Sequence, residues 1–506
     1  MSDETVRAAL RSDARFVVIE APAGSGKTHH GAEYARDVAA VAGSGRPLIL
    51  THTHAACSVF ADRTKGTGAR VEVRTIDSLI GSIAGAYHAG LGLPADIAGW
   101  VRRTDNGHAE LSTRVAALLQ RHPMIATAIA ARHPVVVCDE HQDTSAEQHS
   151  VVTAIHQGGA SLRVFADPMQ RIFGERTPAN DTACDWDEIT QSADTHELLD
   201  TPHRWNRGCP QLGAWTLAAR ESLRRGGTVD LRDGNRPPSI DVAVAENRAQ
   251  RNLAYQLALG DRRAIDAFEQ QHGNLLILTR HNGTASSLRS FFNRRIPLWE
   301  GYTRYALDGL VDAISAANGD CQRLGAAIVA FMGEVATGFS PSAFGDVFQR
   351  EIREQCAQKR RGRPAKLQGL ARLLLDQPDH CGVSAVLRNI AAFVENDSDF
   401  GDIKFDCKRE FWDATRLGAS PTVEEGLSDV THRRNHMRPT PPSKAISTIH
   451  KAKGLECDAA IVMPCDRATF PDNFVARCVL YVALSRAKSR LLLVVSRNNP
   501  SPLLQL

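Results

Sequence analysis

The chain has 506 residues, of which 43% are apolar and 23% are charged, values that are ordinary for a folded globular protein. They exclude disordered, collagen-like and low-complexity classes, and at about 150 residues per domain the length suggests three or four domains. Lysine plus arginine number 60 against 57 for aspartate plus glutamate, and the formal net charge of +3 is too small to indicate a class of partner.

The eleven cysteines occur singly, and no two of them form a C-x-x-C pair. This spacing excludes the paired-cysteine patterns of zinc and iron–sulfur sites. The N-terminus is polar and charged, unlike a secretory leader, and the odd cysteine count predicts reduced thiols in the cytoplasm. No stretch approaches the roughly 18 apolar residues that a membrane span needs, so we expect a cytoplasmic protein with no membrane partner.

Short apolar runs alternate with stretches of helical periodicity along the chain. Such runs, rich in Val, Ile and Leu, predict strands of a parallel sheet that helices cover on both faces. Their spacing predicts a doubly wound α/β architecture with two groups of strands. The runs are Phe16–Glu20, Pro47–Leu50, Pro134–Cys138, Ser161–Phe165, Asn274–Leu278, Ala459–Met463 and Arg490–Val495.

Two stretches interrupt these groups and predict the domain organisation. We expect a first core from 1–85 and 131–225 with a short helical insertion at 86–130. We expect a second core from 226–300 and 441–506, with a mainly helical insertion at 301–440. The latter holds a basic run, Lys359–Arg363, which is either a contact for duplex nucleic acid or a solvated charged face.

A glycine-rich loop follows the first apolar run. Residues 16–28, FVVIEAPAGSGKT, predict a strand, a phosphate-binding loop and then a helix, with Ala21 in place of the usual first glycine. Backbone N–H groups can surround phosphate oxygens, Lys27 can reach the β- and γ-phosphates, and the Thr28 hydroxyl can bind Mg²⁺. The predicted nucleotide-binding residues here are Ala23, Gly24, Ser25, Gly26, Lys27, Thr28 and His29. Alone, the loop fits a kinase, GTPase, transporter or helicase equally well.

Two acids follow another apolar run, in the string PVVVCDEHQD at 134–143. The carboxyl end of a parallel strand opens onto the ligand crevice, so Asp139 can hold the Mg²⁺ that bridges the phosphates. Glu140 can polarise the attacking water, which favours hydrolysis. In isolation, such acids can equally be solvated turn residues.

Eight segments in chain order resemble the motifs of superfamily 1A helicases, the UvrD/Rep/PcrA group. DEHQD at 139–143 resembles motif II, and FADPMQRIF at 165–173 resembles motif III. TIHKAKGLE at 448–456 and YVALSRA at 481–487 closely resemble motifs V and VI. The others are THTHAACSVFADR (51–63), VRTIDSL (73–79), LDTPHRW (199–205) and LILTR (276–280), which resemble Ia, Ib, L-x-x-N-Y-R-S and motif IV.

The resemblance implies an α/β fold of two RecA-like P-loop NTPase cores, with ATP and Mg²⁺ between them. Gln170 would sense the γ-phosphate, and Arg280 and Arg486 would stabilise transition-state charge, as a guanidinium supplied from a second domain can. Gly454 and Glu456 would complete the nucleotide site, with Glu456 on the ribose. The predicted catalytic residues are therefore Lys27, Asp139, Glu140, Gln170, Arg280 and Arg486, and the predicted metal ligands are Thr28 and Asp139.

The resemblance also implies a track for single-stranded DNA, built from phosphate contacts and stacking faces. The sequence departs from the family in three places: His52 replaces a Phe, Glu175 replaces a Trp, and residues 1–20 lack the adenine-reading Gln. The first two weaken base stacking, and the third loosens base discrimination. The predicted DNA contacts are Thr51, His52, Thr53, His54, Thr75, Asp77, Phe173, Arg176, Trp205 and His450.

The compact plan, with no nuclease segment after motif VI, resembles the helicase-like subunit of Gabija-type anti-phage systems, which works beside a separate OLD-family nuclease. We expect a DNA-dependent ATPase that moves along single-stranded or tailed DNA, 3′ to 5′ in the family. One alternative is a nucleic-acid-sensing ATPase subunit that activates a partner nuclease with little unwinding. Another is a P-loop enzyme acting on a small molecule, which motifs V and VI disfavour.

Overall fold

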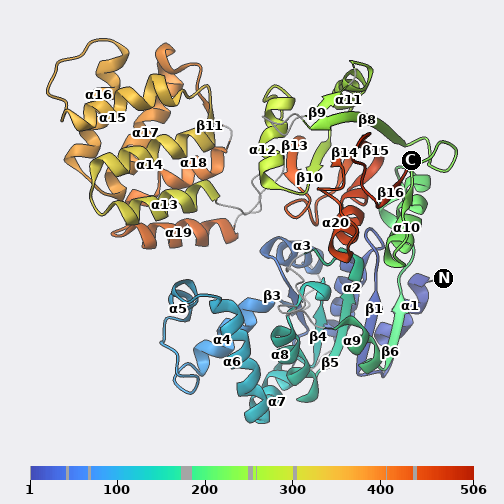
Figure 1. Ribbon diagram of the computed structural model, residues 1–506. Helices are drawn as coiled ribbons and strands as arrows, with labels where there is room; N and C mark the ends of the chain where they lie inside the picture. The colour runs from blue at the N-terminus through green and yellow to red at the C-terminus, as the bar shows by residue number, and fades with distance from the viewer. Residues whose placement is uncertain are drawn as a thin grey trace. The chain divides into compact units, whose positions relative to one another are not determined.

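The computed structural model describes residues 2–41, 45–65, 70–172, 185–248, 255–257, 259–299, 305–405, 407–436 and 442–506. The chain forms two compact units (Figure 1). One is made of Met1–Ser287 together with Thr448–Leu506, and the other is Leu288–Ser447. The predicted helical insertion, 301–440, lies inside the second unit.

The first unit contains a parallel six-stranded sheet in the order β3-β2-β4-β5-β1-β6. Strand β1 lies between β5 and β6, with Phe16 opposite Leu162 and Val17 opposite Thr195. Every residue of β1, β2 and β4 is buried, as expected for strands covered on both faces. The strands are β1 (Phe16–Glu20), β2 (Leu48–Thr51), β3 (Glu72–Thr75), β4 (Val135–Cys138), β5 (Ser161–Ala166) and β6 (Thr195–Leu198).

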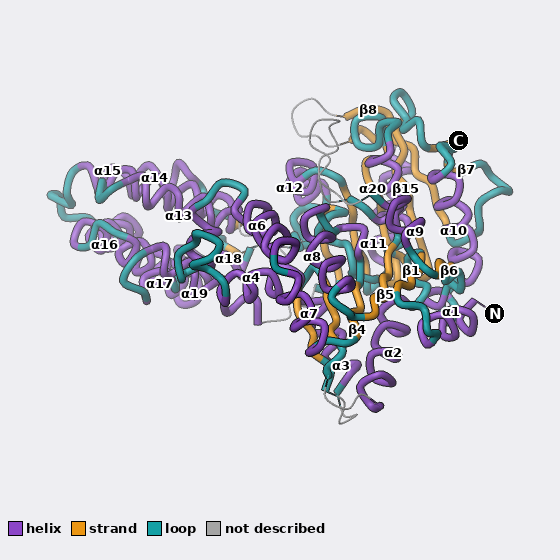
Figure 2. Tube along the Cα trace, turned by 90° about the horizontal axis from the view of Figure 1, so that it is seen from below, coloured by secondary structure: helices purple, strands orange, loops and turns teal. Residues whose placement is uncertain are grey.

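Helices cover both faces of this sheet, seen as purple layers beside the orange strands in Figure 2. Successive side chains of β1 point to opposite faces of the sheet. Val17 and Ile19 pack with α1 and α2 on one face, whereas Val18 packs with α4, α6 and α8 on the other. The predicted insertion at 86–130 shares the apolar cluster of this second face. The helices are α1 (Ser2–Arg11), α2 (Lys27–Val41), α3 (His54–Thr64), α4 (Ile76–Ala86), α5 (Ile97–Arg103), α6 (Gly107–Arg121), α7 (Pro123–Arg132), α8 (Ala146–Gln157), α9 (Trp186–Ser192) and α10 (Pro210–Arg224).

A second six-stranded sheet has the order β13-β10-β14-β15-β8-β9. The pairs β10–β14, β14–β15 and β15–β8 are parallel, and β9 joins the edge antiparallel to β8. Helix α20 (Phe474–Leu484), which precedes β15, is almost entirely buried. The strands are β8 (Ile240–Arg248), β9 (Tyr255–Leu257), β10 (Leu275–Thr279), β13 (Lys444–Thr448), β14 (Cys457–Cys465) and β15 (Ala487–Ser496). The α/β fold with parallel sheets flanked by helices is therefore confirmed, and it is consistent with RecA-like cores.

The unit Leu288–Ser447 is mainly helical, and its helices pack around an apolar cluster. Its basic run is partly neutralised within the unit, because Arg360 pairs with Glu351 at 2.7 Å and with Glu354 at 3.1 Å. This arrangement favours a structural role for Arg360 over a contact to duplex nucleic acid. The main helices are α13 (Tyr305–Ala317), α14 (Cys321–Val335), α15 (Val347–Arg353), α16 (Arg363–Asp376), α17 (His380–Asn396), α18 (Lys408–Ala414) and α19 (Val423–His436).

Over the described ranges, no helix combines the length and the apolar character that crossing a bilayer would require.

Candidate active site

The predicted phosphate-binding loop connects the carboxyl end of β1 to the first residue of α2, Lys27. Gly24 has a φ of +75°, and a Cβ there would lie 2.7 Å from the Cβ of Arg204. Only glycine satisfies both the left-handed backbone and this close approach. The Ser25 hydroxyl donates to the Pro22 carbonyl at 2.8 Å and tightens the turn. The loop therefore has the strand–turn–helix geometry in which backbone N–H groups receive phosphate.

Lys27 and the two acids after β4 meet at the same sheet edge. The Lys27 ammonium lies 3.1 Å from Oε1 of Glu140, and its side chain is 9% exposed. Glu140 has a φ of +54°, a strained conformation for a residue with a side chain, and such strain is common at functional sites. Oδ1 of Asp139 is buried and makes no hydrogen bond to any residue described.

Electrostatics distinguish the two acids. Burial and the neighbouring Glu140 raise the pKa of Asp139. Burial alone would also raise the pKa of Glu140. The positive charges of Lys27 and Lys453 outweigh this effect, so the pKa of Glu140 is lowered. Asp139 thus presents a buried carboxylate oxygen with no hydrogen-bond partner among the described residues, and Thr28, the second residue of α2, carries a hydroxyl that can supply another ligand oxygen. Carboxylate and hydroxyl oxygens are the ligands that Mg²⁺ prefers, so these residues fit that ion.

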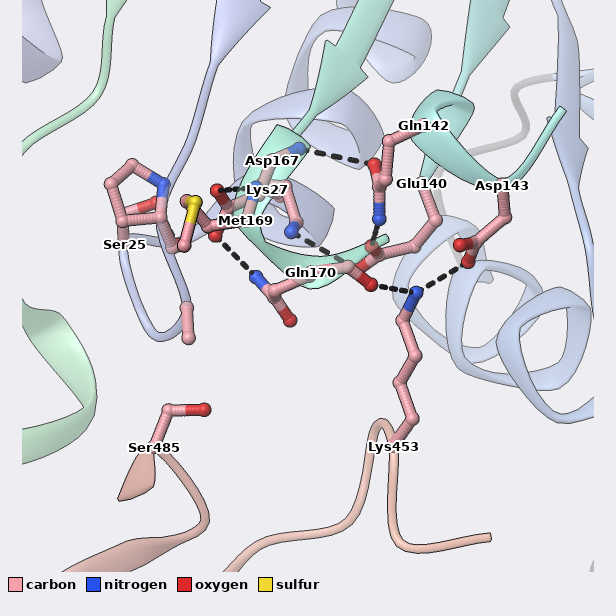
Figure 3. A network of polar contacts seen from close by, with 12 residues as sticks. Ser25, Lys27, Glu140, Gln142, Asp143, Asp167, Met169, Gln170, Lys453 and Ser485 are labelled. Carbon is pink, nitrogen blue, oxygen red and sulfur yellow. Dashed lines mark hydrogen bonds and ion pairs between the residues drawn. The ribbon is translucent and has the colours of Figure 1, made fainter. Parts of the chain in front are cut away.

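A hydrogen-bonded network extends from Glu140 to the end of β5 (Figure 3). The Gln142 amide donates to Glu140 at 2.5 Å and accepts from the Asp167 backbone N–H at 3.0 Å. Oδ2 of Asp167 accepts from the Gln170 amide at 2.8 Å. Gln170 lies in the short 3-10 helix η2 (Pro168–Gln170) and is 4% exposed. The predicted γ-phosphate sensor is thus held by the network that also orients Glu140.

Lys453, from the loop between β13 and β14, joins this network from the second core (Figure 3). Its ammonium lies 2.5 Å from Asp143 and donates to the Gln170 carbonyl at 2.7 Å. Both side chains of the ion pair are at most 10% exposed, so the pair is shielded from water. One cation therefore connects the acid segment after β4, the η2 segment and the second core.

The other oxygen of Asp167 belongs to a buried ion cluster below the loop. Arg220 of α10 donates to Asp167 Oδ1 from Nε at 3.0 Å and from Nη2 at 2.8 Å. Nη2 also donates to Glu20 at 2.6 Å, and Arg224 reaches the same Glu20 oxygen at 2.9 Å. The side chains of Arg220, Glu20 and Asp167 are at most 5% exposed. This cluster fixes the ends of β1 and β5 relative to α10.

One residue of the second core and one residue of the segment after β6 contact the phosphate-binding loop itself. The Tyr481 hydroxyl of α20, fully buried, accepts from the Ala23 N–H at 2.9 Å. Arg204 lies in η3 (His203–Trp205), and its backbone N–H donates to the Gly24 carbonyl at 3.1 Å. Its guanidinium donates to the Ser485 carbonyl and to Glu456. Arg204 therefore places a cation next to the loop.

The two predicted arginines are engaged elsewhere in this structure. Arg486 is 1% exposed and donates to the carbonyls of Val482 and Leu455 at 2.8 and 3.2 Å. Burial and the nearby Arg204 lower the pKa of Arg486 to about 10. Arg280, at the end of β10, donates to the Thr469 carbonyl at 2.8 Å. A catalytic role for either guanidinium stays a prediction, and it requires these bonds to be exchanged for phosphate oxygens.

The predicted ribose ligand Glu456 lies between two cations, Arg204 at 2.8 Å and Lys488 at 3.0 Å. Burial alone would raise the pKa of Glu456, but the two cations hold it at about 2. Gly454 precedes it with a φ of +83°. His29 is exposed beside the loop, with its ring centroid 5.6 Å from that of His30.

The predicted DNA contacts of the Ia and Ib segments are mostly engaged within the core. Thr51 is buried and donates to the Thr53 carbonyl at 3.0 Å, and the Thr53 hydroxyl caps α3. His52 lies 2.9 Å from the Thr144 hydroxyl, and burial lowers its pKa, which favours a neutral ring. Thr75 is buried and caps α4. Asp77 is exposed and accepts from Gln148 at 2.8 Å.

Trp205 is fully buried, and its Nε1 donates to the Ala487 carbonyl at 2.8 Å. In this conformation Trp205 is a packing residue and offers no face to a base. His450 is partly buried and pairs with the Ile172 carbonyl at 3.1 Å. Phe173, Arg176 and Glu175 lie outside the described residues, as does the side chain of His54, the first residue of α3.

Several residues of this site were absent from the predicted set. Arg204 stands at the Arg of the L-x-x-N-Y-R-S segment, and Lys453 and Tyr481 stand inside the segments that resemble motifs V and VI. Their positions inside these motif-like segments are the sequence signal by which the three residues could have been predicted. The contacts of Arg220 had no sequence signal, because α10 carries no motif and meets Glu20 and Asp167 only through the tertiary fold.

Family models match two segments of the chain. Residues 100–185 match the UvrD/REP helicase N-terminal domain, and residues 445–494 match the UvrD-like helicase C-terminal domain. These matches support a UvrD/Rep-like helicase with DNA-dependent ATPase or helicase activity, and such helicases use ATP, typically with Mg²⁺. No curated protein matches the chain.

Proposed function

We propose that this UvrD/Rep-like chain is a motor that hydrolyses ATP to step along single-stranded DNA, 3′ to 5′, and to open tailed duplexes. The observation that carries the proposal is the meeting of Lys27, Glu140 and the unpartnered Asp139 oxygen at one sheet edge. Tyr481 and Arg204 contact the same loop from outside the first sheet. In such a site, binding and hydrolysis of ATP can drive the closing and opening of the two cores.

The proposed roles follow from the donor and acceptor chemistry of each side chain. The loop N–H groups and Lys27 bind the phosphates, and Thr28 and Asp139 hold Mg²⁺, which would neutralise charge on the β- and γ-phosphates. Glu140, whose carboxylate is kept ionised by Lys27 and Lys453, accepts a proton from the attacking water. Before ATP binds, Lys27 and Glu140 satisfy each other's charge.

Lys453 and Arg204 supply the coupling in this proposal. Lys453 of the second core bonds Asp143 and Gln170 of the first. Arg204 of the first core bonds Glu456 and Ser485 of the second. A nucleotide that competes for the Lys453 ammonium or the Arg204 guanidinium therefore changes contacts between the cores. Arg280 and Arg486 would then be drawn toward the γ-phosphate. Opening and closing repeated with each ATP would move DNA past the segments that hold Thr53 and His450, and a phosphate contact by either would require its present hydrogen bond to be exchanged.

A second candidate is a nucleic-acid-sensing ATPase subunit that activates a separate nuclease, of the OLD family in an anti-phage setting. Two observations favour it. Trp205 is fully buried, and the His52 ring is held by a hydrogen bond to Thr144, so two of the aromatic side chains predicted to contact DNA are engaged within the protein in this structure. A weak stacking track suits brief recognition of a DNA end better than processive stepping.

The first experiment measures the ATPase rate of the purified chain with and without single-stranded DNA. We expect strong stimulation that Arg486→Ala abolishes. Glu140→Gln should lower hydrolysis by about 100-fold or more while ATP binding persists, whereas Lys27→Ala should lose binding. Glu110→Gln, in an exposed helical pair with Arg114, is the matched control and should behave as wild type. Equal loss of binding in Glu140→Gln and Lys27→Ala would contradict the assigned roles.

Strand displacement on a tailed duplex then separates the two candidates. Robust unwinding by the isolated chain supports the motor. DNA-stimulated hydrolysis without unwinding supports the sensor, and absence of any DNA effect would refute both.

A further inference from the structure

Three potential metal ligands from separate parts of the chain meet beside the phosphate-binding loop. Asp3 is in the first turn of α1, His30 is in α2, and His203 is in η3. Nε2 of His203 lies 2.9 Å from Oδ2 of Asp3, and Nε2 of His30 lies 3.4 Å from Oδ1 of the same carboxylate. One ligand atom from each residue lies within 4.8 Å of the other two.

The burial of this group differs from that of a surface ion pair. His30 is 2% exposed. Oδ1 of Asp3, which it faces, is shielded from solvent and makes no hydrogen bond within the described part of the chain. Leaving a buried carboxylate oxygen unpaired is costly unless another group satisfies it. The side chain of His203 is 43% exposed, so the group has an open side toward solvent.

We propose that Asp3, His30 and His203 form a binding site for a zinc-type divalent ion. Two imidazoles and one carboxylate are a ligand set that Zn²⁺ or Co²⁺ takes, with a water molecule in the fourth position. Mg²⁺ is disfavoured, because it prefers oxygen ligands and octahedral geometry.

The ion would fasten three elements around the loop. A Cβ placed on Gly26 would lie 3.4 Å from Cδ2 of His203 and 3.6 Å from Cδ2 of His30, so both imidazoles border the loop. A bound ion would fix α1 and η3 against the start of α2 and would stabilise the folded chain through linkage. This inference does not depend on the proposed motor or sensor function, because it concerns binding and stability alone.

The test uses the full chain without an affinity tag, freed of metal by a chelator and then titrated with Co²⁺. We expect one Co²⁺ per chain, a visible absorption band typical of a tetrahedral ion, displacement by Zn²⁺, and a higher thermal unfolding temperature with metal. Asp3→Asn and His203→Ala should each weaken Co²⁺ binding by at least about 10- to 100-fold, the loss that even outer partners of metal ligands produce. Neither variant removes the buried His30, so both should fold.

His122→Ala, an exposed histidine at the end of α6, is the matched control and should bind Co²⁺ as wild type does. Three outcomes would overturn the proposal. Absence of a band up to millimolar Co²⁺ would show that the group is only a hydrogen-bonded clamp. Equal affinity in Asp3→Asn would place the ion elsewhere, and a sulfur-to-cobalt charge-transfer band would assign it to cysteines.

Discussion

Replacing Arg220 with methionine should destabilise the first unit far more than the same change at Arg224. Arg220 makes three charge-assisted hydrogen bonds to Asp167 and Glu20, whose side chains are 0% and 3% exposed. Arg220→Met keeps most of the side-chain volume, but it leaves the buried Asp167 carboxylate without its cation and leaves Glu20 paired with the half-exposed Arg224. Removing one partner of a buried ion pair costs about 3 to 5 kcal/mol, or a roughly 100- to 5,000-fold smaller ratio of folded to unfolded chains.

The matched control is Arg224→Met, because Arg224 also pairs with Glu20 but is much more exposed than Arg220. Arg224 contacts the same Glu20 oxygen, yet its side chain is 45% exposed. Exposed pairs contribute about 0 to 1 kcal/mol, so Arg224→Met should have a small effect. Hydrogen exchange of peptides covering β1 and β5 reports the opening free energy of this sheet alone, without interference from the other unit.

The reasoning would be refuted if the opening free energies of the two variants differed by less than about 1 kcal/mol. A rescue adds a second check. In the Arg220→Met background, Asp167→Asn removes the buried charge that has lost its cation and should recover part of the lost stability. No recovery would indicate that the loss comes from packing of the arginine stem.

Three further predictions concern the loop and its neighbours. Gly24→Ala places a methyl group 2.7 Å from the Cβ of Arg204 and strains the backbone by about 1 to 3 kcal/mol, so equilibrium titration should show roughly tenfold weaker ATP binding or worse. Tyr481→Phe leaves the buried Ala23 N–H without its acceptor, and urea unfolding should show a loss of about 1 to 3 kcal/mol, whereas an unchanged midpoint would contradict the structural role of that bond. The folded-state pKa of Glu456 is lowered, so its stabilising effect is complete above the ordinary value of 4.5 and disappears as pH falls toward about 2. The difference in unfolding free energy between wild type and Glu456→Gln should shrink across that window, and a constant difference would argue against the ion pair.

The strands were predictable where apolar runs are bounded by turn residues. The run Phe16–Glu20 coincides with β1, because Arg15 precedes it and Ala21-Pro22 ends it. β8 was not predicted, since its last residues, Glu246 to Arg248, are polar and break the apolar pattern. Its pairing with β15, a long-range contact, determines that strand more than its own composition does.

Some residues of the candidate site could likewise be predicted from the sequence, and others could not. Lys27, Asp139 and Glu140 could be identified because each follows a strand at a position where parallel strands deliver side chains to one edge. Trp205 was predicted to contact DNA because the sequence identifies an aromatic side chain but does not determine its orientation. Its indole N–H instead donates to the backbone of β15. The ion pair of Lys453 with Asp143 depends on the approach of the second core, which no local pattern encodes.

The composition of the first unit has a consequence for synthesis on the ribosome. Its phosphate-binding loop emerges early, but Lys453, Tyr481 and the two central strands β14 and β15 belong to Thr448–Leu506. At 5 to 20 residues per second, translating Leu288–Ser447 takes on the order of 10 to 30 s, during which the helical unit can fold while the second sheet lacks its middle. The nascent chain therefore completes its nucleotide site and the interior of its second sheet in the same final step, so an interrupted chain would expose sheet edges and would lack the contacts that Lys453 and Tyr481 make to the site.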